Sequence, residues 1–516
     1  MTYKFLLLTV AILCISLAPG GAHASPAMLT VNSTGDGGDA SPGDGVCQTA
    51  TPGECTLRAA IQEANANPGT DTIAFNIPGA GSHTIRPASA LPDIGDPVVV
   101  DGYTQPGASP NTEPLGSGTN AVLEIELDGT NAGAETYGLT LRIAGGTTII
   151  RGLAINRFGG NGVLGLGQDI VLQGNFIGAD VTGKAGLGNR YNGIQLDGTN
   201  GTIGGTAPEA RNVISGNAIR GVFLGNATGV VIQGNLIGTD AAGTADLGNG
   251  EGVELYGGSN NTVGGTTAGA GNVISGNAWG VGIGYGETGA LIEGNLIGTN
   301  AAGTAGLGNT LGGVVVYHGA TSNTIGGTAV GAGNTIAHNG VGVRVEAAST
   351  TGNTVCANSI HSNGGSGIEL LDGGNTELAP PIVDRADGFV TGHTSPKCYP
   401  CTVEIFSDSD GQGRTYHGST STNDDSAGTW THMGAANGPN VTATVTDADG
   451  NTSEFSVPVP FPAPVGGVAE YPQVEPQAAM GDSSHAATRS LLIAGLAAGV
   501  IAIAATAWRC GNRLRG

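Results

Sequence analysis

Four charged side chains have the types and spacing that could cleave a polysaccharide: Asp169, Asp180, Asp197 and Arg190. A glycosidase uses two or three carboxylates on one face, and a lyase uses carboxylates that hold Ca²⁺ beside an arginine or lysine base. The four residues fall in adjacent turns of the repeat described below, so they could meet. Scattered surface charges are the commoner cause of such a pattern, and that interpretation stands beside the catalytic one.

Aromatic residues supply a second candidate site. Tyr256 and Tyr317 each lie four residues after a repeated glycine, two turns of the repeat apart. Trp279 and Tyr285 lie on the turn between them, and His318 is adjacent. Because aromatic residues are only 4% of the chain, this group could form a shallow platform for stacking sugar rings. The ordinary alternative is that aromatic side chains near corners cover loops.

Acidic clusters near the C-terminal end could bind a cation. The segments SDSDGQG and TDADGNTSE contain Asp408, Asp410, Asp447, Asp449 and Glu454. Oxygen-rich turns of this kind can hold Ca²⁺, although neither segment has the full ligand spacing of an EF-hand loop. Asp, Asn and Gly populate hairpin turns without any metal, so Ca²⁺ is a possible cofactor rather than a required one.

A repeat must position these residues. The segments GNFIGADVTGKAGLGN, GNLIGTDAAGTADLGN and GNLIGTNAAGTAGLGN begin at Gly174, Gly234 and Gly294, which gives a period of 60. A finer marker is a glycine followed by alternating apolar residues, and it occurs at Gly162, Gly193, Gly221, Gly252, Gly280, Gly313, Gly340 and Gly367. The 60-residue unit is therefore two turns of a shorter repeat, which is typical of a solenoid.

The local period indicates which solenoid this is. Apolar residues follow each marker at offsets one and three, as in Ile194 and Leu196, which is the alternation of a β-strand. No helical period separates the strands, so the pattern predicts a parallel β-helix. Its sharp corners fall at Gly-Asn pairs, and the asparagines can form hydrogen-bonded ladders between turns. The corner asparagines include Asn175, Asn217, Asn235, Asn277 and Asn295.

One segment, Cys55 to Asn65, has a helical pattern instead. Leu57, Ala60, Ile61 and Ala64 are spaced to share one face of a short helix. A solenoid exposes its first turn as an apolar surface with unpaired strand edges, so we expect this helix to cap it.

The cysteines fit an exported protein. Cys47 and Cys55 flank a short polar loop, which predicts a disulfide. Cys398 and Cys401 have the CxxC spacing of redox motifs, but no thioredoxin-like context surrounds them, and a structural disulfide is the favoured interpretation. Cys356 is left without an assigned partner.

The stretch GDGVCQTATPGECTLRAAIQEANANPGTDTIAFNIPG resembles the CSLREA-type segment at the start of many bacterial exported proteins. The matching elements are Cys55 to Ile61, Ala64-Asn65 and Asp71 to Phe75, with Ala59 where glutamate is usual. The repeats that follow are similar to the right-handed parallel β-helix repeats that accompany this segment. The resemblance covers residues 28–376 and implies the fold and export, but no activity.

The two ends and the charge suggest where the protein works. A basic start, an apolar run and Ala22-His23-Ala24 predict a signal peptide, and Leu491 to Trp508 followed by arginines predicts a membrane helix with a cytoplasmic C-terminus. The alternative for that helix is a buried core element. The net charge is −23 with 18 Lys and Arg, which excludes a basic surface for nucleic acid.

After the solenoid, alternating strands with Gly/Asp turns predict an immunoglobulin-like β-sandwich, and a proline-rich stalk follows. The expected fold class is all-β. The expected segments are a signal peptide (1–24), a CSLREA-type cap (25–79), a right-handed parallel β-helix (80–379), the sandwich (380–456), the stalk (457–490), the transmembrane helix (491–508) and a basic tail (509–516).

The function expected from these features is that of a non-catalytic, membrane-anchored cell-surface protein that adheres to glycan or matrix along the solenoid face. The alternative is a surface polysaccharide lyase or glycosidase of the β-helix type. A structural spacer without a ligand is the third interpretation. An outward cluster of carboxylates in a groove would favour the enzyme, and an aromatic stripe would favour glycan binding.

Overall fold

The structure, a computed structural model, describes residues 26–434, 436 and 438–461. The expected signal peptide, membrane helix and basic tail lie outside these residues, as does the expected stalk beyond residue 461. Within them, no helix is long and apolar enough to cross a membrane.

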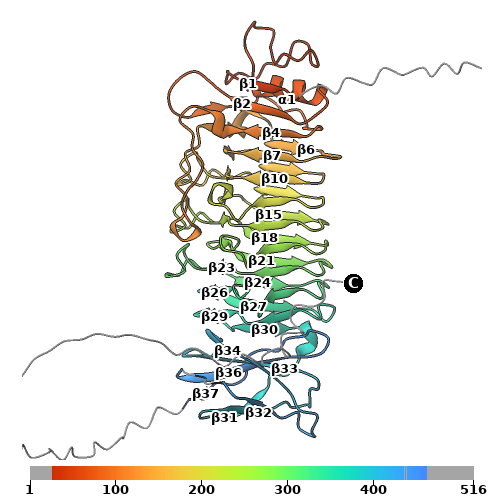
Figure 1. Cartoon of the computed structure of the whole chain (residues 1–516), viewed down its shortest axis with the longest axis vertical. Helices are drawn as coiled ribbons and strands as arrows, with labels where there is room; N and C mark the ends of the chain where they lie inside the picture. Colours follow the sequence, from red (N-terminus) through yellow and green to blue (C-terminus); the bar gives the residue numbers. More distant parts are fainter. Residues whose placement is uncertain (1–25, 435, 437, 462–516) are drawn as a thin grey trace, which may run out of the picture.

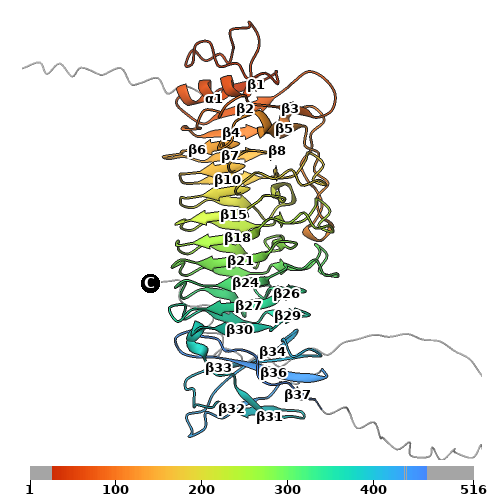
Figure 2. The same cartoon turned by 180° about the vertical axis from the view of Figure 1, so that it is seen from behind.

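The described chain winds through three long parallel sheets, A, B and C, whose strands are joined turn after turn (Figures 1 and 2). Sheet A contains β1 (Met28–Val31), β2 (Asp71–Phe75), β4 (Val98–Asp101), β7 (Thr148–Arg151), β10 (Ile170–Gln173), β13 (Thr202–Gly204), β16 (Val231–Gln233), β19 (Thr262–Gly264), β22 (Leu291–Glu293), β25 (Thr324–Gly326) and β28 (Thr354–Cys356). Sheet B contains β3 (His83–Ile85), β5 (Ile125–Asp128), β8 (Leu153–Asn156), β11 (Phe176–Ile177), β14 (Val213–Ile214), β17 (Leu236–Ile237), β20 (Val273–Ile274), β23 (Leu296–Ile297), β26 (Thr335–Ala337) and β29 (Ser359–His361). Sheet C contains β6 (Leu139–Leu141), β9 (Val163–Gly165), β12 (Ile194–Leu196), β15 (Arg220–Gly225), β18 (Glu251–Tyr256), β21 (Trp279–Gly284), β24 (Gly312–Val316), β27 (Val341–Glu346) and β30 (Ile368–Leu371). This arrangement is a parallel β-helix, consistent with the right-handed form.

The core of the solenoid is built from the alternation that the sequence shows. In sheet C, Ile194 pairs with Val222 and Val222 with Val253, and all three side chains are fully buried. Each turn therefore adds one layer of aliphatic side chains to a single continuous apolar core. Burial of such a side chain contributes roughly 1.5–3 kcal/mol, so the stability accumulates turn by turn.

Asparagine ladders hold the corners, as the sequence predicted. One ladder lies between sheets A and B, where the Nδ2 of Asn235 donates to the Oδ1 of Asn272 at 3.0 Å, and Asn272 donates likewise to Asn295 at 2.9 Å. Its members are Asn175, Asn212, Asn235, Asn272, Asn295, Asn334 and Asn358. A second ladder between sheets B and C consists of Asn189, Asn217, Asn249, Asn277, Asn309, Asn339 and Asn363. The sequence predicted stacking between asparagines 60 residues apart, such as Asn235 and Asn295. In the structure a further asparagine, Asn272, lies between these two.

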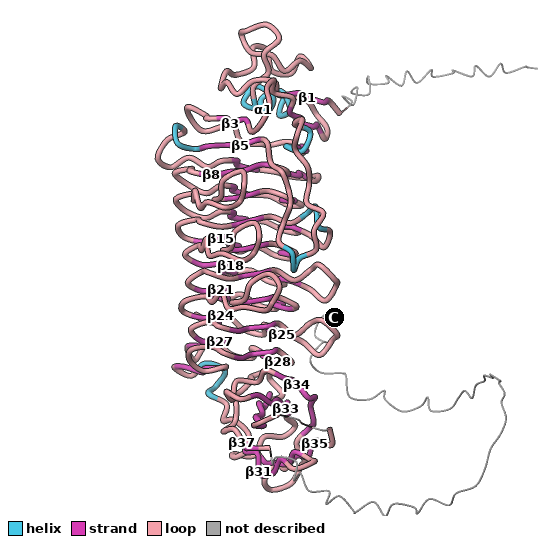
Figure 3. The backbone as a smooth tube through the Cα atoms, turned by 90° about the vertical axis from the view of Figure 1, so that its left-hand side faces the viewer, coloured by secondary structure: helices cyan, strands magenta, loops and turns pink. Residues whose placement is uncertain are grey.

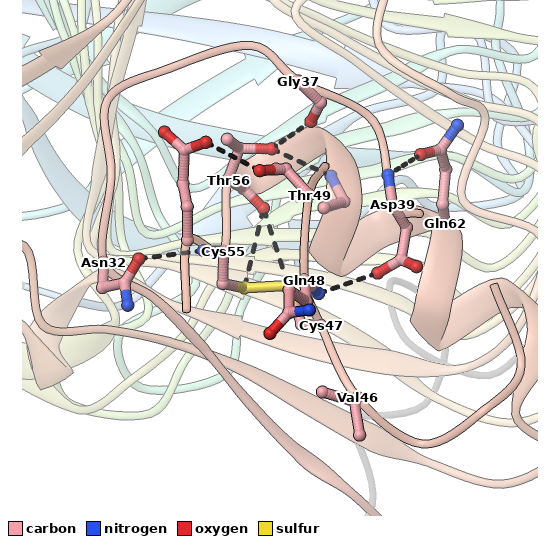
Figure 4. The surroundings of a disulfide bond; sticks show 12 residues. Asn32, Gly37, Asp39, Val46, Cys47, Gln48, Thr49, Cys55, Thr56 and Gln62 are labelled. Carbon is pink, nitrogen blue, oxygen red and sulfur yellow. Dashed lines mark hydrogen bonds between the residues drawn. A yellow bond between two sulfur atoms is a disulfide. The ribbon is translucent and has the colours of Figure 1, made fainter. Parts of the chain in front are cut away.

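The helix α1 (Leu57–Ala66) covers the first turn of the solenoid, at the top of Figure 1. The face that the sequence predicted is buried, and Ile61 is 1% exposed. Thr56 begins the helix by accepting a hydrogen bond from the amide of Ala59, directly after the disulfide between Cys47 and Cys55 (Figure 4). The expected cap segment (25–79) also contains β1 and β2, which are the first two strands of sheet A. The cap and the solenoid therefore share one apolar core.

The outer face of sheet B is covered by a long excursion that the sequence did not predict. Residues 102–122, which we call the strap, run along several turns of the solenoid (Figure 3). The strap contains the short 3-10 helices η1 (Gly102–Thr104) and η2 (Leu115–Ser117). The buried guanidinium of Arg211 holds this strap by donating to the carbonyls of Glu113 and Gly118. Three further 3-10 helices occur at η3 (Gly129–Asn131), η4 (Pro208–Ala210) and η5 (Gly374–Glu377).

Two antiparallel sheets cover the last turn of the solenoid. One contains β31 (Ile382–Ala386), β32 (Val390–His393) and β35 (Trp430–His432), and the other contains β33 (Thr402–Asp408), β34 (Thr415–Ser421), β36 (Asn440–Thr446) and β37 (Val459–Pro460). They enclose their own apolar core around Trp430, as expected for a small sandwich. The edge strand β37 comes from the beginning of the expected stalk and pairs with β36. A disulfide joins Cys398 to Cys401, whereas Cys356 is buried and belongs to neither disulfide.

Candidate functional site

The outer face of sheet C carries a cleft of about 380 Å³, which we call the sheet C cleft. It lies over four consecutive strands, β18, β21, β24 and β27. Its lining residues are Glu251, Glu254, Trp279, Leu311, Val315, Tyr317, Arg344 and Glu346. A cleft of this volume, lined by aromatic rings and a few charged groups, has the usual size and chemistry of a ligand site.

Strand register explains why residues far apart in the sequence meet in the cleft. Glu254 pairs with Gly282, Gly282 with Val315, and Val315 with Arg344. These four residues form one outward column that crosses four turns, with neighbouring strands about 4.8 Å apart. The column therefore places an acid, an apolar side chain and a base along one line.

The sequence-based register was wrong in one turn, and the error concealed a cleft residue. The marker expected at Gly340 begins at Gly342, because Val343 pairs with Val314. The outward residue of that turn is consequently Arg344 and not Gly342. The repeat GVGVRV offers glycines at both positions, and only the pairing of the strands distinguishes them.

Glycines leave room for the large side chains of the cleft. A Cβ atom at Gly282 would clash with the carboxylate of Glu254, and one at Gly312 would clash with the ring of Trp279. A Cβ atom at Gly284 would lie 2.7 Å from the ring of Tyr317. The side chains thus lie across the glycine of a neighbouring turn, flat against the sheet.

Glu254 is the most unusual ionisable group in the cleft. Its side chain is 1% exposed, and its Oε1 accepts a hydrogen bond of 2.6 Å from the hydroxyl of Tyr317. Burial raises the pKa of Glu254 to about 7, against the opposing effect of the Tyr317 hydrogen bond. The same burial, together with the nearby carboxylate, raises the pKa of the Tyr317 hydroxyl. In the repeat, Glu254 occupies the outward position two residues after Gly252, whereas Glu251 precedes that glycine and lies outside the alternating pattern.

Four of the predicted aromatic residues form one cluster, which we call the aromatic group: Tyr256, Tyr285, Tyr317 and His318. The rings of Tyr256 and Tyr285 are stacked, with centroids 4.1 Å apart and planes at 23°. Tyr285 meets Tyr317 edge to face at 5.6 Å and contacts His318 at 4.8 Å. Tyr317 also lines the cleft, so the group and the cleft are continuous.

Two residues of the aromatic group sit on an unusual backbone. Tyr285 has φ of 54° and His318 has φ of 47°, in the left-handed region that bulky residues rarely adopt. The corners of the two preceding turns have Asn226 and Gly257 in this conformation, which are residues that tolerate it. Tyr285 is nevertheless 47% exposed. Strained backbone of this kind clusters at functional sites, and at Tyr285 it presents an exposed aromatic ring.

The opposite side of the cleft combines Trp279 with a network of charges. The guanidinium of Arg344 lies 5.4 Å from the Trp279 ring centre and forms an ion pair of 2.7 Å with Glu369. Glu251 is paired at 2.7 Å with Arg220. The carboxylate of Glu346 has no hydrogen-bond or ion-pair partner among the residues that the structure describes.

The residues predicted as a possible catalytic cluster have separate local hydrogen-bond partners. Asp169 occupies a left-handed corner with φ of 53°, and Asp180 accepts hydrogen bonds from the backbone of its own loop at Lys184. Asp197 accepts a hydrogen bond from Gln195, and burial raises its pKa. No hydrogen bond or ion pair joins any two of these aspartates, or joins one of them to Arg190, in the described part of the chain.

The acidic segments of the sandwich act as turn caps. Asp408 accepts backbone hydrogen bonds from Gln412 and Arg414, and Asp447 accepts them from Asp449 and Asn451. Glu454 accepts a hydrogen bond from the amide of Leu370, in the last strand of sheet C, and Asp410 accepts one from the amide of Ser362. Among residues 26–461 as described, no group of three or more possible ligands could hold a metal ion. Backbone amides thus supply most of the hydrogen bonds to Asp408, Asp410, Asp447 and Glu454, and the side chain of Asn451 supplies one more to Asp447.

Comparison with known proteins gives a likeness of fold only. No protein family and no curated protein matches the sequence. Among solved structures, parallel β-helix proteins match. They include the A-module of the mannuronan C-5 epimerase AlgE6 of Azotobacter vinelandii, at 16% identity and a TM-score of 0.25, over 61% of this chain and 93% of that one. The protein ORF18 of Geobacillus virus E2 matches at 11% identity and 0.31, over 84% and 76%, and the Dettilon tailspike protein at 16% and 0.27, over 78% and 75%.

Proposed function

We propose that the sheet C cleft and the adjoining aromatic group bind a glycan chain. The observation that carries this proposal is the continuous surface of Trp279, Tyr317 and the exposed, stacked Tyr285 along one face of the solenoid. Sugar rings have apolar faces that pack on aromatic rings, and hydroxyl groups that hydrogen-bond to charged side chains. The cleft presents both chemistries, and its turn-by-turn repetition suits a polymer better than a single small molecule.

The experiment measures binding of the full chain to a panel of polysaccharides. Binding is monitored by tryptophan fluorescence and by affinity electrophoresis. Trp279 is a useful fluorescence reporter in the parent chain, because Trp430 is buried in the sandwich core at 1% exposure. Affinity electrophoresis, which needs no tryptophan in the cleft, measures the variants. We expect the Trp279→Ala variant to bind about 5- to 30-fold more weakly, since loss of one stacked ring removes roughly 1–2 kcal/mol.

The control is Tyr399→Ala, which removes a ring that is 51% exposed in the sandwich and distant from the cleft in the sequence. This variant should bind as the parent does. An affinity that is unchanged in Trp279→Ala, or reduced equally in both variants, would contradict a role for the sheet C cleft.

We further propose that the protein acts at the cell surface, exported by residues 1–24 and held by the helix at 491–508. Support comes from the sequence features of these segments and from the CSLREA-type motif, together with the two disulfides. The adhesive interpretation follows from this location. Removal of residues 491–516 should release the protein into the medium, as measured by immunoblotting of cell and medium fractions. Retention of the truncated chain in the cells would contradict the anchor.

A further inference from the structure

The sheet C cleft holds two carboxylates in different environments on the same strand. Glu254 is 1% exposed and Glu251 has a side chain that is 31% exposed. Two neighbouring carboxyl groups with unlike surroundings can remain in opposite protonation states, which is the requirement for acid–base chemistry on a glycosidic bond.

The environment of Glu254 suits an acid. Its Oε1 is occupied by the Tyr317 hydroxyl at 2.6 Å. Its Oε2 has no hydrogen-bond partner among the residues that the structure describes, although the side chain lines the cleft. Burial favours the protonated form and raises the pKa to about 7. Because Oε1 already accepts the Tyr317 hydroxyl, the proton of the neutral form lies on Oε2.

The environment of Glu251 suits an anion. Its Oε2 accepts a hydrogen bond of 2.7 Å from the Nε of Arg220, and the guanidinium of Arg220 lies over the ring of Phe223 at 5.0 Å. A cation at this distance stabilises the ionised carboxylate. Glu251 is therefore held as one half of an ion pair, with its Oε2 on the Arg220 guanidinium.

We propose that the sheet C cleft hydrolyses a glycosidic bond in a glycan that carries no carboxylate groups, with Glu254 as the acid and Glu251 as the base; this rests on the glycan binding proposed above. The proton on Glu254 Oε2 passes to the glycosidic oxygen as the bond between that oxygen and the anomeric carbon breaks. A water molecule forms the new bond to the anomeric carbon and gives its proton to Glu251. The products are a reducing end and an alcohol. Exchange with solvent then returns one proton to Glu254 and removes one from Glu251, so the cycle consumes only water.

The charges around the cleft select the substrate class. The carboxylates of Glu251, Glu254 and Glu346 line the cleft. Among the lining residues, Arg344 is the one cationic side chain. Arg344 is committed to Glu369, as Arg220 is to Glu251. A polyuronate would bring its own negative charges to this surface, where the described residues leave no uncommitted cation to receive them. Neutral and amino-sugar polymers meet no such repulsion.

The test uses the full chain with β-glucan, mannan, chitin oligomers, chitosan and polygalacturonate, and measures both retention of each glycan and release of reducing ends. We expect release from one or more of the uncharged or amino-sugar polymers and none from polygalacturonate. The Glu254→Gln variant should retain the glycan but lose at least about 100-fold in rate, as is typical when a general acid is removed. The rate of the parent should fall as the pH rises above 7.

The matched control is Glu293→Gln, which changes a half-buried glutamate of β22 on sheet A and should leave the rate unchanged. Retention without release from any polymer would overturn the hydrolytic inference and leave glycan binding intact. Release that persists in Glu254→Gln, or that is confined to polygalacturonate, would also overturn it. Absence of retention by every polymer would overturn the inference together with the proposed function.

Discussion

Replacing Asn272 with alanine should lower the free energy of unfolding by about 4 kcal/mol. Its Nδ2 donates to the carbonyl of Ile232 at 2.8 Å and to Asn295, and its Oδ1 accepts from both the backbone amide and the side chain of Asn235. The position is fully buried, so water cannot replace these partners. Each buried polar group left without a partner costs roughly 1–3 kcal/mol, and several are left at this site.

The measurement is thermal and denaturant unfolding of the variant beside Asn76→Ala, which removes an exposed asparagine from the first turns of the solenoid. We expect a change within about 0.5 kcal/mol for the control. Equal melting of the two variants would contradict a stabilising role for the ladder. Because each turn contacts mainly its neighbours, the loss should also appear as local proteolytic sensitivity near residue 272.

A second large effect should come from Glu404, at the junction of the sandwich and the solenoid. This carboxyl group is buried in β33 and accepts a hydrogen bond of 3.0 Å from the amide of Ala357 in the last turn. Burial raises its pKa to about 7, although the hydrogen bonds from Ala357 and Tyr416 oppose the shift. The unfolded chain loses this proton near pH 4.5, so the folded state is destabilised as the pH rises through the window from about 4.5 to 7. The expected contribution is about 3 kcal/mol between pH 4 and pH 8.

The Glu404→Gln variant keeps an acceptor for Ala357 and removes the charge. It should therefore melt higher than the parent at pH 8 and close to it at pH 4. The difference between the two proteins isolates Glu404 from Glu254, whose pKa is raised in the same direction. If the melting temperatures of the two proteins differ by the same amount at pH 4 and at pH 8, Glu404 makes no pH-dependent contribution to stability.

The solenoid could be predicted because its signals are local and repeated. One strand of each turn is specified by a four-residue pattern: glycine, apolar residue, any residue, apolar residue. The Gly-Asn corner specifies where the next strand begins. The sequence also predicted the disulfide between Cys47 and Cys55 and the buried helix face around Ile61, because both depend on residues close in sequence. Alternation of short strands similarly indicated the sandwich.

The cleft could be predicted only in part, because it depends on register between turns of unequal length. Tyr256, Tyr285, Tyr317 and His318 were expected to meet and do meet. The hydrogen bond between Glu254 and Tyr317 crosses 63 residues and exists because Gly282 and Gly284 leave space. No sequence pattern shows which glycine lies beneath which side chain.

The strap over sheet B escaped prediction for another reason. Residues 102–122 contain few apolar side chains at regular spacing, and backbone carbonyls bound to Arg211 supply much of their attachment. Such contacts depend on backbone geometry and leave no periodic signal. The strap covers one outer face of the solenoid over the apolar residues around Phe176, whereas the cleft lies on the face of sheet C.

A crystal structure of the full chain with an oligosaccharide that it retains would test the proposed glycan site directly. We expect sugar rings in the sheet C cleft, with one ring packed on Trp279 and the chain continuing toward Tyr285. A sugar bound instead on the sandwich, on sheet A or along the strap would contradict the assignment of this cleft.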